Sequence, residues 1–283
     1  NQMKIKKTKF LSLGQIRKYH HKQQILKLRS MGIPLNFFKS PYTYLKSMYI
    51  IETSAILVFL LQNTKVTPNS ITWIFVSLGL LSGLFLASNN DTLIFIGLII
   101  LFTNSTFDWA DGLLARIKNK TSNLGDLLDT WGGLVCVYSY LLGFGIYLYN
   151  KDNDQLFIIL TFFILLTRAL DLKDYGYHHA MYQLSKVNRK DKFNFIKKLN
   201  IGNKPFYKKS KFSILNYVKL FMQNFIDERS RTVDIIIILI FIDTFYFDVI
   251  LLNYIYYYIC FRTIIIFAGG IYVTCYKNFL IKK

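Results

Sequence analysis

Six blocks of apolar residues dominate this chain, and each can be interpreted as a membrane-spanning helix. They cover residues 71–87, 93–110, 127–149, 156–170, 233–251 and 254–276. Hydrophobic residues make up 53% of the chain and charged residues 18%, so a soluble fold would expose far too much apolar surface. The sequence therefore predicts an all-α integral membrane protein with six transmembrane helices.

A shorter apolar stretch, residues 48–61, precedes the first of these blocks and contains Glu52. Its length and its internal charge are typical of a helix that lies in the membrane interface. We therefore expect an interfacial helix leading into the first span. The alternative is a seventh span.

The distribution of Lys and Arg favours six spans over seven. Residues 1–46 carry eleven of them and residues 173–232 carry fourteen, whereas the turns at 88–92 and 248–253 carry none. Cytoplasmic loops are enriched in Lys and Arg, and six spans place every basic segment on one side. We expect both termini in the cytoplasm, a basic cytoplasmic segment over 1–46, and a membrane domain over 47–283 with a basic loop at 173–232.

The formal net charge of +19 has two interpretations. A basic loop can bind nucleic acid, but no recognised nucleic-acid motif accompanies this one, and we expect no such partner. Near anionic membrane lipid, each Lys or Arg contributes about 1 kcal/mol of attraction. We therefore expect the loop to lie on the lipid surface.

Four carboxylates stand where the second span ends and the third begins. Asp108 and Asp111 close the second block, and Asp126 and Asp129 open the third. Ionised groups at membrane depth are costly unless they are paired or bind a ligand. These four residues are therefore the first candidates for a functional site.

Helical periodicity predicts that three of the carboxylates converge. Asp108 and Asp111 share one stripe of their helix, and Asp129 lies on a similar stripe of the next, which a short turn makes an antiparallel neighbour. Three carboxylates do not stay ionised together without a cation, and a site with oxygen ligands only suits Mg²⁺ or Mn²⁺. Helix capping is the alternative; it suits Asp126, in a first turn, better than residues at a helix C-terminal end.

These residues belong to a longer pattern that resembles the signature of the CDP-alcohol phosphotransferase family, D-x2-D-G-x2-A-R-x8-G-x3-D-x3-D. The matching positions are Asp108, Asp111, Gly112, Ala115, Arg116, Gly125 and Asp129. The stretch 67–72 also resembles the start of the first helix in that family.

The resemblance implies a specific chemistry. Members bind a CDP-alcohol donor and two Mg²⁺ or Mn²⁺ ions at the cytoplasmic membrane face; an acceptor alcohol attacks the β-phosphate and CMP leaves. By this resemblance Asp108, Asp111 and Asp129 hold the metals, and Gly112, Ala115, Arg116 and Gly125 form the nucleotide pocket. It further implies phospholipid or related synthesis and a homodimer. The short six-span form suggests a bacterial inner membrane.

One position departs from the signature. Its final Asp, which the family is proposed to use as general base, falls on Gly133. The catalytic base is therefore unassigned, and the alternative function is a family relative that binds CDP compounds or lipid without turnover. A transporter or channel is disfavoured because the polar residues gather at one face rather than at mid-membrane.

Overall fold

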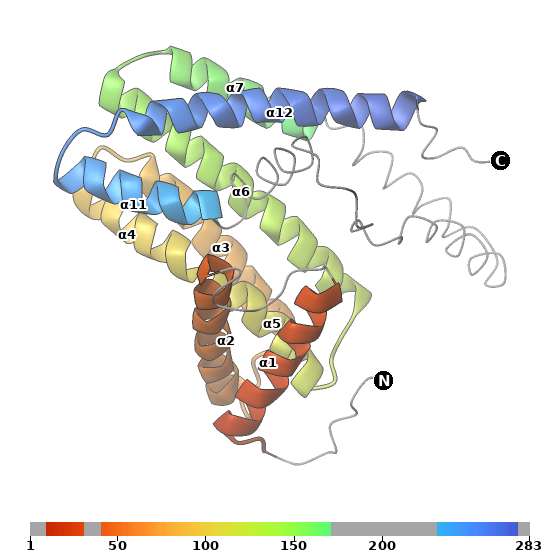
Figure 1. Ribbon diagram of the computed structural model, residues 1–283. Coiled ribbons are helices and arrows are strands. Elements are labelled where there is room, and N and C mark those ends of the chain that lie inside the picture. The colour runs from red at the N-terminus through yellow and green to blue at the C-terminus, as the bar shows by residue number, and fades with distance from the viewer. Residues whose placement is uncertain (1–9, 31–40, 171–230, 277–283) are drawn as a thin grey trace. The chain divides into compact units, whose positions relative to one another are not determined.

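The structure, a computed structural model, describes residues 10–30, 41–170 and 231–276, and within these ranges it is helical without strands (Figure 1). The helices are α1 (Leu13–Ser30), α2 (Pro41–Leu61), α3 (Pro68–Leu86), α4 (Asp91–Thr103), α5 (Ser105–Ile117), α6 (Asn123–Asp152), α7 (Leu156–Ala169), α11 (Arg231–Phe245) and α12 (Leu251–Tyr276). The predicted all-α class is confirmed.

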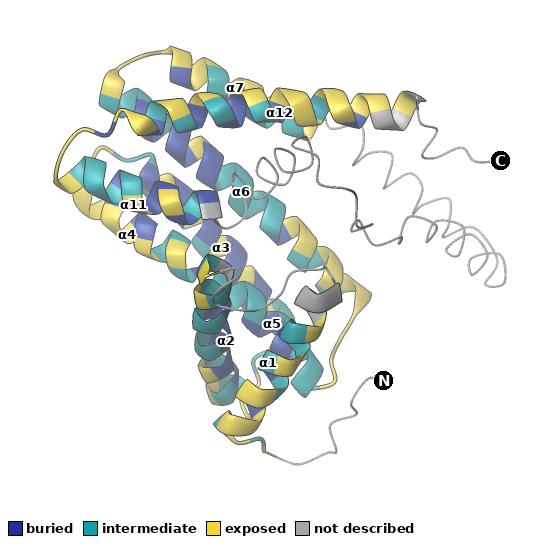
Figure 2. Cartoon of the chain, viewed as in Figure 1, coloured by how far each residue is buried: buried dark blue, intermediate teal, exposed yellow. Residues whose placement is uncertain are grey.

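Five stretches of the described chain are long and apolar enough to cross a membrane. They are Tyr44–Leu61, Pro68–Leu86, Asp91–Ile117, Asn123–Asp152 and Leu251–Tyr272. Helix α7 is apolar but shorter. Many large apolar side chains on these helices are exposed, as expected of surfaces that face lipid (Figure 2). The chain is therefore an integral membrane protein.

Helix α2 differs from the predicted interfacial helix over 48–61. It begins at Pro41, a residue that favours the first turn of a helix, and its segment Tyr44–Leu61 has the length and composition of a span. Glu52, whose charge suggested an interfacial position, forms an ion pair with Arg17 of α1 at 2.6 Å. By its length and composition, α2 can therefore be a membrane span or a helix that lies in the membrane interface.

The predicted span 233–251 is not a single helix. Helix α11 ends at Phe245, α12 begins at Leu251, and Asp248 lies in the break. Alone, α11 has 15 residues, shorter than a typical span. The basic loop predicted for 173–232 lies outside the described residues except for Arg231 and Thr232.

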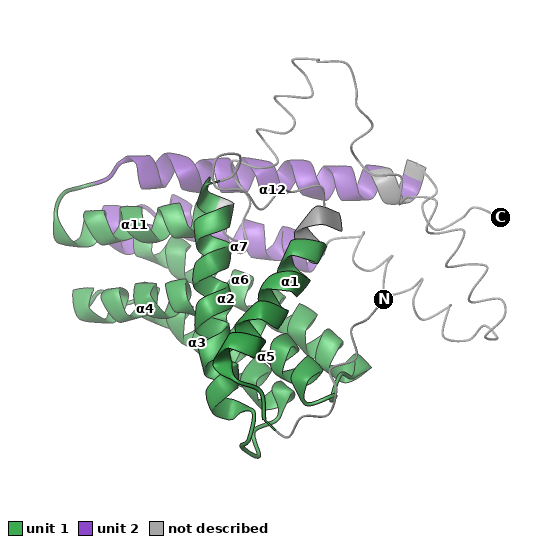
Figure 3. Ribbon diagram, turned by 60° about the horizontal axis from the view of Figure 1, so that its bottom comes forward, with its two compact units in different colours: residues 1–147, 222–248 green, residues 148–221, 249–283 purple. Residues whose placement is uncertain are grey.

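The chain divides into two compact units (Figure 3). The first holds α1 to α5, α6 as far as Tyr147, and α11; in it α3 packs on α4 and α5, and α2 packs on α5 and α1. Its central apolar cluster consists of Ile16, Ala55, Val58, Ile71, Ala110, Leu113 and Leu114. In the second unit, α7 packs against α12.

Small residues bring α3 close to α6. A Cβ added at Gly79 would lie 2.1 Å from Cys136 Sγ, and one at Gly83 would lie 2.2 Å from Ser139 Oγ. Any larger side chain at these two positions would force the helices apart. The glycines therefore place the start of α6 beside the start of α3, where the carboxylates of α6 lie.

Helix α1 docks on α2 through a buried histidine. The His20 ring is fully buried, with Nδ1 3.2 Å from Ser54 Oγ and Nε2 3.3 Å from Gln24 Nε2, and it packs against Trp109 of α5. An amide nitrogen can only donate, so Nε2 accepts and the ring is neutral. Burial, and then the charge of Arg116, lowers the pKa of His20 to about 4.

This docking predicts an acid-sensitive stability. Between pH 6.5 and 4 an unfolded His20 takes up a proton that the folded one refuses, so stability falls as pH falls through this range. From pH 7 to pH 5 we expect a loss of about 2 kcal/mol in the free energy of unfolding, measured in detergent. His20→Gln should flatten this dependence and the neighbouring His21→Gln should retain it. Equal slopes in both variants would contradict the assignment.

Candidate active site

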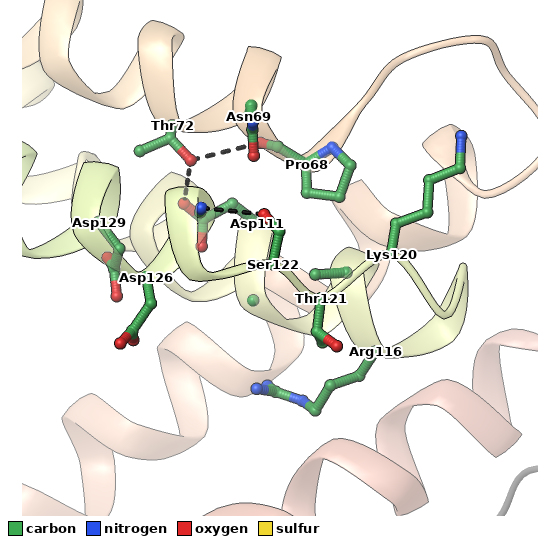
Figure 4. A pocket seen from close by; sticks show the side chains of 13 residues that line it. Pro68, Asn69, Thr72, Asp111, Arg116, Lys120, Thr121, Ser122, Asp126 and Asp129 are labelled. Carbon is green, nitrogen blue, oxygen red and sulfur yellow. Dashed lines mark hydrogen bonds between the residues drawn. The ribbon is translucent and has the colours of Figure 1, made fainter. Parts of the chain in front are cut away.

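A pocket opens where the N-terminal ends of α3 and α6 meet the second half of α5 (Figure 4). Its lining residues are Pro68, Asn69, Thr72, Asp111, Gly112, Ala115, Arg116, Lys120, Thr121, Ser122, Gly125, Asp126 and Asp129. Three carboxylates and two cationic side chains therefore share one small space. Such a mixture suits a ligand that carries negative charge together with a divalent cation.

The helix that carries the first carboxylates is interrupted at Asn104. Helix α4 ends at Thr103 and α5 begins at Ser105, and the buried Asn104 amide donates to Cys136 Sγ at 3.6 Å. Asp108 therefore lies in the first turn of α5. The sequence had placed it at the C-terminal end of one long helix. Asn104 keeps helical dihedral angles, its N–H still bonds to Ile100 O and its C=O accepts the Phe107 N–H. The backbone bonding therefore continues through it, and Asp108 has no separate helix end to cap.

Asp111 is the buried carboxylate of the pocket, with only 5% of its surface exposed. Thr72 Oγ1 on α3 donates a hydrogen bond to Asp111 Oδ2 at 2.6 Å (Figure 4). Asp129 on α6 is close enough for its charge to act on Asp111. Two carboxylates from different helices thus face the same space, one of them fixed by a neighbouring hydroxyl.

The first turns of α6 supply the rest of this wall. Asp126 lies in the first turn and Asp129 three residues later, and Ser122 Oγ accepts the Gly125 N–H at 3.0 Å. The amide groups at a helix N-terminus carry partial positive charge and bind phosphate oxygens readily. This end of α6 can therefore hold phosphate as well as present carboxylates.

Two cations complete the lining. Arg116 comes from the last turn of α5 and Lys120 from the turn before α6. Arg116 Nε is buried and has no hydrogen-bond partner within the described part of the chain. Guanidinium groups pair with phosphate through two parallel hydrogen bonds, so Arg116 has donor capacity available for a phosphate in the pocket.

The pocket gathers most of the residues that the sequence singled out. Asp111, Gly112, Ala115, Arg116, Gly125 and Asp129 all line it. Asp108 does not; it lies close enough to Cys136 of α6 for its charge to act there. Across the described ranges, no group of three or more His, Cys, Asp or Glu side chains is placed to hold a metal ion. Metal binding by all three predicted residues stays a prediction.

The remaining pair nevertheless suits a divalent cation. Asp111 and Asp129 offer carboxylate oxygens only, the ligands that Mg²⁺ and Mn²⁺ prefer. Mg²⁺ usually binds proteins through one or two carboxylates and completes its shell with water and substrate phosphates. The donor set fits an ion that is shared between the chain and a diphosphate ligand.

Sequence reasoning assigned no role to the α3 wall of the pocket. Thr67 caps α3 by accepting the Ser70 N–H, Pro68 follows in the first turn, and Asn69 and Thr72 face the pocket. The signal was available, because the stretch 67–72 resembles the start of the first helix in the family. The hydrogen bond from Thr72 to Asp111 depends on the tertiary fold and leaves no trace in local sequence.

Gly133, which replaces the final Asp of the signature, borders open space. A Cβ added there would meet no atom within 4 Å, apart from its own helix and chain neighbours. Gly133 lies about one turn beyond Asp129 on α6 and almost one turn before Cys136. A larger side chain therefore fits without displacing its surroundings.

Comparisons with known proteins match the part of the sequence that contains the pocket. Residues 65–197 match the model of the CDP-alcohol phosphatidyltransferase family. The chain is also similar to the inner membrane protein YnbA of Escherichia coli (strain K12), with 33% identity over 115 residues. That alignment covers 40% of this chain and 56% of YnbA. Every pocket residue lies inside the family match, so the stretch of this integral membrane protein that contains the pocket, residues 65–197, is similar to the CDP-alcohol phosphatidyltransferase domain.

Proposed function

We propose that this domain transfers a phospho-alcohol group from a CDP-alcohol to an acceptor alcohol and releases CMP. One observation carries the proposal: six residues of the family signature, contributed by α5 and α6, line a single pocket. We further propose that the reaction takes place at the cytoplasmic face of a bacterial inner membrane, with both termini in the cytoplasm. The product would be a phospholipid or a related membrane component.

In this proposal Asp111 and Asp129 would hold Mg²⁺ or Mn²⁺, with Asp108 as the third predicted ligand, and the second ion is implied by the family resemblance alone. A metal held there would supply positive charge to neutralise the diphosphate and to stabilise the leaving group. Thr72 keeps Asp111 oriented through its hydrogen bond, which spares the carboxylate a reorganisation when the donor binds. Arg116 binds phosphate beside this centre.

The glycines keep the pocket open for the nucleotide. A Cβ at Gly112 would lie 3.4 Å from the Arg116 guanidinium, and one at Gly125 would lie 3.3 Å from Ser122 Oγ. Side chains at either position would occupy the space that a CDP group needs next to the backbone. This agrees with the nucleotide-binding role that the resemblance implies for Gly112, Ala115, Arg116 and Gly125.

Gly133 supports a second candidate function. With glycine at this position, the acceptor hydroxyl lacks the carboxylate that the signature would place beside it. General-base help is worth about 10² to 10⁴ in rate, so its loss slows transfer without abolishing metal-assisted chemistry. The second candidate is therefore a relative that binds CDP compounds or lipid and turns over poorly or not at all.

A direct assay distinguishes the transferase from a relative that binds CDP compounds without turnover. Purified protein in lipid nanodiscs with Mn²⁺ or Mg²⁺ is incubated with radiolabelled CDP-diacylglycerol, CDP-choline or CDP-ethanolamine and a mixture of polyol and lipid acceptors. We expect CMP release from at least one donor and its loss when EDTA removes the metal. Binding of CDP compounds without CMP release would favour the second candidate, and the absence of both would overturn the two together.

A further inference from the structure

Lys118 connects two walls of the pocket without entering it. This residue caps the C-terminal end of α5, two positions after Arg116. Its Nζ donates hydrogen bonds to Thr64 O at 2.9 Å and to Val66 O at 2.8 Å. Both acceptors lie in the turn between α2 and α3, so one ammonium group joins this turn to the end of α5.

The turn that Lys118 holds leads directly into the α3 wall. Val66 O is followed by the cap residue Thr67, and then by Asn69 and Thr72, which face the pocket. Thr72 in turn bonds to Asp111, in the α5 wall. A shift of the turn would therefore move the α3 wall relative to the carboxylate and to the glycines that face it.

The beginning of the same turn is fixed separately. The Gln62 side chain accepts the Leu11 N–H at 3.1 Å and donates to Leu11 O at 2.9 Å. This contact ties the end of α2 to the residues that precede α1, away from the pocket. Thr64 Oγ1 also accepts the Val66 N–H from within the turn, and Lys118 is the side chain that joins this half of the turn to α5.

A plain surface lysine, retained for its positive charge at the membrane face, is the alternative. Lys65 provides the comparison, because it lies in the same turn, between the two acceptor residues, and its side chain is exposed. A role that depends only on charge near the membrane would make the two lysines equivalent. The pair of short hydrogen bonds to backbone carbonyls distinguishes Lys118.

We propose that Lys118 is a positioning residue: it sets the width of the donor pocket by fixing the start of α3 against the end of α5. The inference rests on the proposed function for its effect on nucleotide binding. The two hydrogen bonds from Lys118 to the turn, which we call the clamp, do not depend on that function and can be measured separately.

The test compares Lys118→Met with Lys118→Arg and with the matched control Lys65→Met. In nanodiscs, Lys118→Met should raise the Kd for CDP and the KM for the donor about tenfold, a loss that one charge-assisted hydrogen bond can account for, with kcat unchanged. Lys118→Arg should restore most of the affinity, and Lys65→Met should match the wild type. Amide hydrogen exchange over residues 62–72 should quicken in Lys118→Met only.

The outcomes are separable. Unchanged exchange over 62–72 in Lys118→Met would overturn the clamp. Faster exchange with an unchanged Kd, or a fall in kcat and thermal stability that Lys118→Arg does not reverse, would overturn the positioning role. If the wild type binds no CDP compound, the proposed function fails, and the exchange measurement alone decides whether Lys118 holds the turn.

Discussion

Asp111→Asn is expected to abolish metal binding and to lower the rate of CMP release by at least about 10³, because metal stabilisation of a phosphoryl leaving group is worth several kcal/mol. The amide has nearly the shape of the carboxylate and still accepts the Thr72 hydrogen bond, so the helices keep their packing. What disappears is the negative charge at the most buried carboxylate of the pocket. The variant therefore tests the effect of the carboxylate charge while the packing of the helices stays the same.

Two measurements check this result in the same preparation. Mn²⁺ binding in the presence of CDP is followed by electron paramagnetic resonance, and CMP release is followed with the donor that the wild type uses. Asp91→Asn is the matched control, since it removes the same charge at the other end of the same span. Retained activity in Asp111→Asn, with Asp91→Asn also active, would mean that the site is wrongly assigned.

Much of the fold can be predicted from the apolar blocks, because a membrane span must be long and apolar where it crosses lipid. The exceptions have local causes. The Glu52 charge suggested an interfacial helix, but the sequence could not show that Arg17 pairs with it. Asp243 and Asp248 interrupt the fifth apolar block and leave its outer end open in the sequence, and hydropathy averaged over a window does not show that the helix ends at Phe245.

The candidate site, too, could be predicted from the sequence only in part. The position of Asp111, Gly112 and Ala115 on one helix face follows from helical periodicity and needs no tertiary information. Asp108 was placed on the same stripe as Asp111, but it does not line the pocket and instead lies close enough to Cys136 for its charge to act there. The contribution of Thr72 depends on how α3 approaches α5, which the small residues between α3 and α6 help to set. Contacts of this kind lie beyond any local pattern.

Gly133→Asp is expected to raise the rate of transfer by up to about 10², the lower range of what a general base contributes. The position allows it, since an added side chain meets no atom within 4 Å outside its own helix and chain neighbours. It lies four residues beyond Asp129, or about 6 Å along the axis, on the same face of α6. The nearby Cys136 is the residue on which the charge of Asp108 acts. A carboxylate at 133 would therefore lie on the face of α6 that carries Asp129, about one turn further from the start of the helix.

The same substitution should tighten Mn²⁺ binding, because a further carboxylate adds both a ligand and negative charge. Two controls separate this effect from helix propensity and from bulk. Gly133→Ala should stabilise α6 by about 0.5–1 kcal/mol and leave the rate unchanged, since glycine is unfavourable in a helix interior. Gly133→Asn supplies the volume without the charge. A rate that falls equally in the Asp and Asn variants would show that the open space belongs to the acceptor, and that the missing carboxylate does not limit this chain.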